Sequence, residues 1–108
     1  IVSTPQDLAL IDARRAIDLF QKAGVPILGL VENMAGYCCP HCGGISDPFG
    51  SGGAEAAAVE LGIPFLGRVP LTIAIRTASD AGQPPAAGED DTVFAPLAAK
   101  VAEALDRL

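Results

Sequence analysis

Basic residues are scarce in this 108-residue chain, and long apolar runs are absent. Seven Lys and Arg stand against 13 Asp and Glu, which gives a formal net charge of −6. Nucleic acids and anionic membranes bind clusters of Lys and Arg, so this balance argues against both classes of partner. No apolar run approaches the roughly 20 residues that cross a bilayer, and no basic segment precedes a secretory signal. The sequence therefore predicts a protein with neither a nucleic-acid nor a membrane partner.

Cysteine is absent outside one short stretch. The three cysteines stand at 38, 39 and 42, and the single histidine, His41, lies among them. An odd number of cysteines, two of them adjacent, argues against a disulfide framework. Because free thiols are typical of a reducing compartment, the sequence predicts a cytoplasmic protein.

A phosphate-binding loop is also missing. The only lysines are Lys22 and Lys100, and neither follows a glycine, whereas a Walker A loop requires the pattern GxxxxGK[ST]. The glycine cluster FGSGGAE at 49–55 is therefore interpreted as the start of a helix near Ala54.

Helical and strand patterns alternate along the chain. Apolar residues recur every three or four positions over 6–22, which predicts an amphipathic helix with Thr4 as its N-cap and Pro5 at its first position. Apolar runs at 26–32 and 64–70 each follow a Gly-x-Pro helix stop and suit strands covered on both faces. Further helices are expected at 54–61, 73–81 and 92–108, a strand at 1–3, and a polar Pro- and Gly-rich loop at 81–91.

This alternation predicts one α/β domain over residues 1–108. Its expected architecture is a three-layer parallel sheet with flanking helices, because strands that alternate with helices form parallel βαβ units.

The stretch AGYCCPHCGG at 35–44 carries the chemistry. We expect it to be a loop, because the glycines and prolines between 36 and 50 interrupt regular structure. A Cys-x-x-Cys turn brings two sulfurs to one point, yet metal centres and clusters usually take four protein ligands. Two copies of the loop about a two-fold axis would supply four thiolates, so we predict a metal or cluster held between two chains by Cys39 and Cys42. Cys38, in an extended stretch, points away from Cys39, and neither it nor His41 is assigned as a ligand.

Three uses of this cysteine pair remain open. They are an iron–sulfur cluster held for transfer, a structural zinc ion between protomers, and thiol–disulfide exchange. In favour of exchange, CPHC resembles the active site of oxidising thioredoxin-fold enzymes. In those enzymes the first cysteine lies at the N-terminus of a helix. Here Gly-Gly-Ile-Ser-Asp-Pro follows the second cysteine, and such a sequence does not form a helix. A c-type haem is excluded, because it requires His directly after the second cysteine and Gly43 stands there.

Several motifs together resemble the Mrp-type family of P-loop ATPases, relatives of MinD that carry iron–sulfur clusters. The motifs are STPQDLALIDARRAIDLF, GLVENMAGYCCPHCG, FGSGGAEAAAVELGIPFLGRVPL and IRTASDAGQP. The resemblance implies that this chain is the C-terminal portion of a P-loop NTPase fold, with the Walker A loop upstream. It also implies that Cys39 and Cys42 bind a [4Fe–4S] cluster shared across a homodimer, and that Asn33 and Pro70 contact the adenine of ATP.

The resemblance further implies apo iron–sulfur proteins as recipients, and ATP with Mg²⁺ only in the full-length protein. Phosphoryl transfer depends on the loop, its lysine and Mg²⁺, so we expect no ATP hydrolysis by these 108 residues. The chain departs from the family at Cys38, where an apolar residue is usual, and at Thr72, where an Asp is common.

Overall fold

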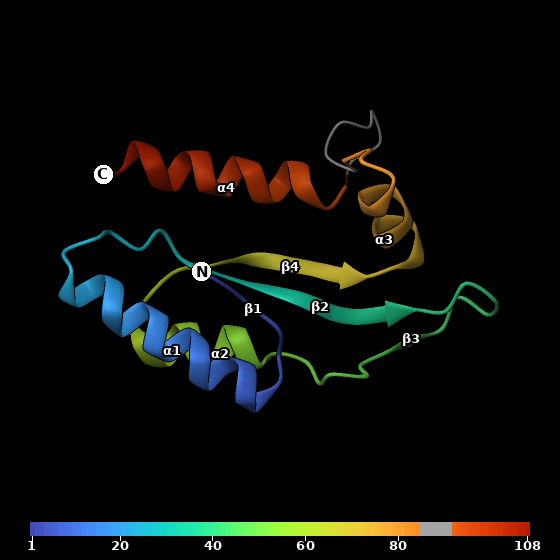
Figure 1. Ribbon diagram of the computed structural model, residues 1–108, viewed down its shortest axis with the longest axis horizontal. Coiled ribbons are helices and arrows are strands. Elements are labelled where there is room, and N and C mark those ends of the chain that lie inside the picture. The colour runs from blue at the N-terminus through green and yellow to red at the C-terminus, as the bar shows by residue number, and fades with distance from the viewer. Residues whose placement is uncertain (85–91) are drawn as a thin grey trace.

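The computed structural model describes residues 1–84 and 92–108 and shows an α/β fold (Figure 1). The helices are α1 (Asp7–Lys22), α2 (Gly53–Leu61), α3 (Ile73–Asp80) and α4 (Phe94–Asp106). The strands are β1 (Val2–Ser3), β2 (Leu30–Cys38), β3 (Ile45–Ser46) and β4 (Phe65–Leu71). All four predicted helices are confirmed within a few residues. Of the loop predicted at 81–91, residues 85–91 lie outside the described part.

The sheet is mixed, with β2 at its centre. β2 pairs in parallel with β1 on one side and with β4 on the other, and it pairs antiparallel with the short β3. The expectation of an all-parallel sheet is therefore wrong at β3. The chain reverses in a tight turn between β2 and β3, and only antiparallel strands can be joined by so short a connection.

Helices lie on both faces of the sheet. α1 and α2 lie on one face and α4 lies on the other (Figure 1). Leu30 of β2 packs with buried residues of α1 and α2, whereas the next residue, Val31, packs on the opposite face with β4 and α4. This alternation follows from the period of two in a strand, and it explains why the β2 sequence is apolar at consecutive positions.

Two element starts differ from the sequence prediction. The N-cap of α1 is Gln6 and no side chain caps it, because the hydroxyl of Thr4 donates instead to Gln6 Oε1 at 3.0 Å. The strand predicted at 26–32 begins only at Leu30, since the backbone before it departs from the ladder, and it continues to Cys38.

Helix α2 begins in close contact with the chain between β1 and α1. A Cβ atom at Gly53 would lie 2.6 Å from the carbonyl oxygen of Pro5 and 2.9 Å from Leu10 Cδ1. Position 53 therefore requires glycine, because the start of α2 lies against Pro5 and against Leu10 of α1. No helix in the described ranges combines the length and apolar character needed to cross a membrane.

Candidate functional site

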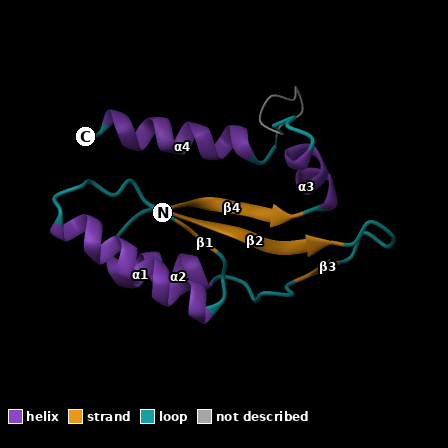
Figure 2. Cartoon of the chain, in the orientation of Figure 1, coloured by secondary structure: helices purple, strands orange, loops and turns teal. Residues whose placement is uncertain are grey.

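The cysteine pair lies between β2 and β3, in a hairpin that extends from one end of the sheet (Figure 2). Tyr37 pairs with Ser46, and Cys38 pairs with Ile45. Beyond these pairs, the N–H of Cys39 donates to the carbonyl of Gly44 at 2.9 Å, and the N–H of Gly43 donates to the carbonyl of Cys39 at 2.9 Å. The expectation of a loop is confirmed for residues 39–44 and wrong for residues 35–38, which continue β2. The glycines accommodate the reversal of the chain and do not prevent the strands from pairing.

Backbone N–H groups donate hydrogen bonds to both sulfurs of the turn. The N–H of Cys42 lowers the pKa of the Cys39 thiol, the N–H of His41 adds to this effect, and the Cys42 side chain contributes further. The N–H of Gly44 donates to Cys42 Sγ at 3.4 Å. Hydrogen bonds to sulfur favour the thiolate, which is the form that binds metal. The turn thus favours the thiolate of Cys39 and places the sulfur of Cys42 beside it.

The turn is exposed and its ligand set is small. Cys42 and His41 are exposed and Cys39 is half-buried. Among the residues that the structure describes, no group of three or more His, Cys, Asp or Glu side chains is placed to hold a metal ion. Cys38 belongs to the ladder of β2 and is outside the turn. Within the described part of one chain, the turn therefore provides a two-thiol site.

The other two predicted site residues lie on neighbouring strands, Asn33 within β2 and Pro70 near the carboxyl end of β4. Asn33 of β2 is in register with Val69 of β4, the residue before Pro70. Asn33 Oδ1 accepts a hydrogen bond from the N–H of Met34 at 2.9 Å. A cavity of about 290 Å³ borders Asn33 and is otherwise lined by apolar residues of β1, β2, β4, α3 and α4. Asn33 and Pro70 therefore lie one register position apart on adjacent strands, and the cavity borders Asn33 and Val69.

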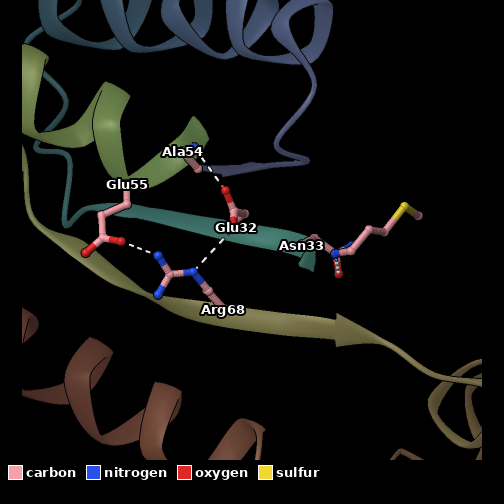
Figure 3. A network of polar contacts seen from close by, with 6 residues as sticks. Glu32, Asn33, Ala54, Glu55 and Arg68 are labelled. Atoms are coloured by element: carbon pink, nitrogen blue, oxygen red, sulfur yellow. Dashed lines mark hydrogen bonds and ion pairs between the residues drawn. The ribbon is translucent and has the colours of Figure 1, made fainter. Parts of the chain in front are cut away.

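The structure also reveals a buried charge network that the sequence analysis missed (Figure 3). Glu32 is fully buried, and its Oε1 accepts a hydrogen bond at 3.0 Å from the N–H of Ala54, in the first turn of α2. Its Oε2 lies 3.3 Å from Nε of Arg68 on β4, and Arg68 also pairs with Glu55 of α2. A carboxylate at a helix N-terminus satisfies an otherwise unpaired donor. The sequence signal was an acidic residue inside an apolar run, followed by the small residues that begin α2.

Comparison with known families decides the relationship. The family profile described as "ParA: NUBPL iron-transfer P-loop NTPase" matches residues 1–106. The chain belongs to this family. This result confirms the predicted relation to the iron–sulfur P-loop NTPases.

Individual relatives of this chain agree with this assignment. An "Iron-sulfur cluster carrier protein" of Methanocaldococcus jannaschii is 48% identical over 78% of this chain and 29% of its own length. An "Iron-sulfur cluster transfer protein NUBPL" of Dictyostelium discoideum is 54% identical over 78% of this chain and 26% of its own length. A nucleotide-binding protein of Archaeoglobus fulgidus, solved in complex with ADP, superposes with a TM-score of 0.63 at 35% identity, covering 76% of this chain and 35% of that one.

This family member thus spans less than a third of the length of these curated relatives. Its placement as the C-terminal portion of a longer fold stays a prediction.

Proposed function

We propose that this chain binds an iron–sulfur cluster as cargo and passes it to apo iron–sulfur proteins. Its relatives include proteins named as cluster carriers and cluster transfer proteins. The observation that carries the proposal is the exposed turn in which backbone N–H groups point at both Cys39 and Cys42. Thiolates with such hydrogen bonds are the usual ligands of iron–sulfur clusters.

The finer form of the proposal is a [4Fe–4S] cluster bridged between two protomers. Cys39 and Cys42 supply two thiolates, and the same turn of a second copy supplies the other two. Release then requires only that thiolates of a recipient replace these four, one iron–sulfur bond forming for each that breaks, with no net oxidation or reduction. An exposed turn permits this exchange, because the recipient can approach the irons. We expect such a homodimer to act in the cytoplasm.

The nucleotide part of the proposal concerns Asn33 and Pro70. We propose that they contact the adenine of ATP when a phosphate-binding loop and Mg²⁺ are present, as in a full-length P-loop protein. The position of Pro70 at the carboxyl end of β4, one register position from Asn33, supports this role, because open α/β sheets bind ligands at that edge. The ADP-bound relative supports nucleotide binding in the same family.

Anaerobic reconstitution with ferric iron and sulfide tests the cluster proposal. We expect about two irons per chain, a thiolate-to-iron absorption band, and transfer to an apo [4Fe–4S] protein. Cys39→Ser and Cys42→Ser should abolish the band, whereas Cys38→Ser, the matched control on β2, should retain it. Equal iron uptake by the Cys39 and Cys42 variants would contradict the proposal.

Structural zinc between protomers is the alternative that the same thiols can support. Elemental analysis of aerobically purified protein distinguishes the two, since a structural site would retain about one zinc per two chains and resist iron. Thiol–disulfide exchange is less well supported, because Cys39 lies in a hairpin turn and no helix begins there. Turnover in an insulin-reduction assay would nevertheless favour it.

A further inference from the structure

The hydrogen bond of Glu32 joins the two ends of the segment that carries the cysteines. Glu32 lies in β2 before the turn, and Ala54 lies in the first turn of α2 after it. The bond of 3.0 Å from the N–H of Ala54 to Glu32 Oε1 therefore closes the base of the segment 33–53 (Figure 3). Both Cys39 and Cys42 lie within this segment.

The hairpin within this segment makes few bonds of its own. β3 consists of Ile45 and Ser46, and its pairing with β2 is made through these two residues. Ile45 is 79% exposed, so burial adds little to the pairing. A two-stranded hairpin alone is only marginally stable in water. The geometry of the cysteine turn therefore depends on how the two ends of the hairpin are held.

The outgoing end is held by the sheet and the returning end is held by α2. β2 pairs with β1 and β4 before it enters the hairpin. The returning chain runs from β3 through a linker, residues 47–52, into α2. The N-cap of α2 is Gly52, which offers no side-chain acceptor. Glu32 supplies from β2 the acceptor that a capping side chain would otherwise supply.

Glu32 is fixed at this position by its second oxygen. The side chain is fully buried, and Oε2 lies 3.3 Å from Nε of Arg68, which also pairs with Glu55 of α2. The network thus joins β2, β4 and the first turn of α2. Ala57 and Ala58 pack the rest of α2 into the core. Loss of the Glu32 contact would therefore release the first turn and the linker, while the remainder of α2 stays packed.

We propose that Glu32 is a positioning residue for the cysteine turn. By holding the first turn of α2, it restrains the returning end of the hairpin and keeps Cys39 and Cys42 in one arrangement. Glu32 itself touches neither the cluster nor a recipient. The inference rests on the proposed cluster-binding function for its consequence, whereas the restraint on the turn is measurable in metal-free protein.

Two double variants that differ only in the acceptor offered to Ala54 test the proposal. Glu32→Gln with Arg68→Met, the acceptor-keeping variant, retains a carbonyl oxygen at position 32. Glu32→Leu with Arg68→Met, the acceptor-free variant, removes it. Apolar replacement of a buried ion pair is compatible with folding, and circular dichroism with urea denaturation verifies it. Ile17→Ala is the control for stability alone, because Ile17 is 2% exposed on α1, outside the network.

Hydrogen–deuterium exchange of the metal-free chain measures the order of the turn. The N–H groups of Cys39 and Gly43 donate within it. We expect them to exchange about fivefold faster in the acceptor-free variant, since a buried N–H without an acceptor favours local opening. In Ile17→Ala they should exchange as in wild type, because local opening does not require global unfolding. Equal rates in the two double variants, or the same acceleration in Ile17→Ala, would overturn the proposal.

A longer linker tests the same restraint with Glu32 intact. A Gly-Ser-Gly-Ser-Gly-Ser insertion after Gly50 doubles the length of the linker 47–52. Because each doubling of a flexible loop adds about 0.6 kcal/mol to its closure, we expect exchange at Cys39 and Gly43 to rise about threefold. Unchanged exchange would show that α2 does not restrain the hairpin. This variant keeps every contact of the network, so it also decides the question should the acceptor-free variant fail to fold.

Cluster retention measures the consequence for function. After anaerobic reconstitution, an iron chelator is added and the decay of the thiolate-to-iron absorption band is followed. We expect both double variants to show the same band, because their ligands are unchanged, and the acceptor-free variant to lose it about fivefold sooner. Equal half-lives despite unequal exchange would overturn a role in cluster binding. A wild-type chain that takes up no iron would contradict the proposed function alone, and the exchange rates would still decide whether Glu32 positions the turn.

Discussion

At the residue scale, Glu32 is a fully buried carboxylate whose charge is compensated by two neighbouring elements. The N–H of Ala54 and the guanidinium of Arg68 reach its two oxygens from α2 and β4. Removing one partner of a buried pair leaves an uncompensated charge, which costs far more than losing an exposed pair. Arg68 is 45% exposed and also contacts the half-exposed Glu55. We therefore expect the ion pair of Arg68 with Glu32 to contribute much more to the free energy of unfolding than its ion pair with Glu55.

We expect Arg68→Met to lower the free energy of unfolding by about 3 kcal/mol, because Glu32 is left charged and buried. Glu55→Gln should lower it by less than about 1 kcal/mol, since that pair is exposed to solvent. Urea denaturation measures both. The double variant Glu32→Gln, Arg68→Met should recover part of the loss. Equal effects of Arg68→Met and Glu55→Gln would contradict this account of the network.

The Cys39 thiol has a pKa below its ordinary value because of the N–H groups of Cys42 and His41. The thiolate form therefore favours the folded turn. This contribution is present at alkaline pH and is lost as the pH falls through the lowered pKa of the folded state. We expect iodoacetamide to alkylate Cys39 with a midpoint at lower pH in native protein than in urea, as measured by site-resolved mass spectrometry. Coincident midpoints in the two conditions would show that the turn does not stabilise the thiolate.

The sequence predicted local features of the site and missed the distant ones. Cys39 and Cys42 are brought together by a turn of four residues, so spacing alone was sufficient to propose the pair. The partnership of Glu32 with Arg68 depends on the register of β2 against β4, which no local pattern encodes. For the same reason, the proximity of Asn33 to Pro70 came from a family resemblance and not from spacing.

At the element scale, the helices were predictable and the middle of the chain was not. α1 to α4 follow from apolar periodicity and from the Gly and Pro residues that end helices. The hairpin does not follow from the sequence pattern, because glycine and proline usually interrupt regular structure. Gly36, at φ 85°, and Met34, at φ 56°, instead lie within β2, where the pairing with β4 is irregular. Positive φ inside a strand is a tertiary property that the sequence pattern did not show.

Helix α2 provides a test of element packing. We expect Gly53→Ala to lower the free energy of unfolding by about 1–3 kcal/mol, because the added methyl would overlap the Pro5 carbonyl and Leu10. Val59→Ala on the exposed side of the same helix should change it by less than about 0.5 kcal/mol. Thermal and urea unfolding compare the two. A neutral Gly53→Ala variant would mean that α2 can move away from α1 at little cost.

At the scale of the whole molecule, the proposed sharing of a cluster between two turns would make assembly depend on metal. Four thiolates require two turns, so cluster binding and dimer formation should be linked equilibria. The exposed Ile45, 79% accessible beside the turn, is available to pack in such an interface. Sequence reasoning predicted the α/β class, but the mixed sheet depended on the unforeseen hairpin.

Metal removal tests this linkage. We expect light scattering to give twice the chain mass after cluster reconstitution, and a return to the single-chain mass after treatment with an iron chelator. Cys38→Ser should behave as wild type, because that thiol lies outside the turn. A cluster-loaded protein of single-chain mass would require two ligands from elsewhere in the same chain and would exclude the bridged site.

Strand β2 has one further mechanical consequence. The register of its pairing with β4 shifts between Asn33 and Tyr37. The residues before this shift and the residues after it therefore pair with β4 as two separate segments. A rotation of the backbone at Met34 could therefore reorient the part of β2 from Tyr37 onward without breaking the pairs that Leu30 to Asn33 make with β4. In the proposed two-chain site, each Cys-x-x-Cys turn could then reorient toward its counterpart while Asn33 keeps its pairing with β4.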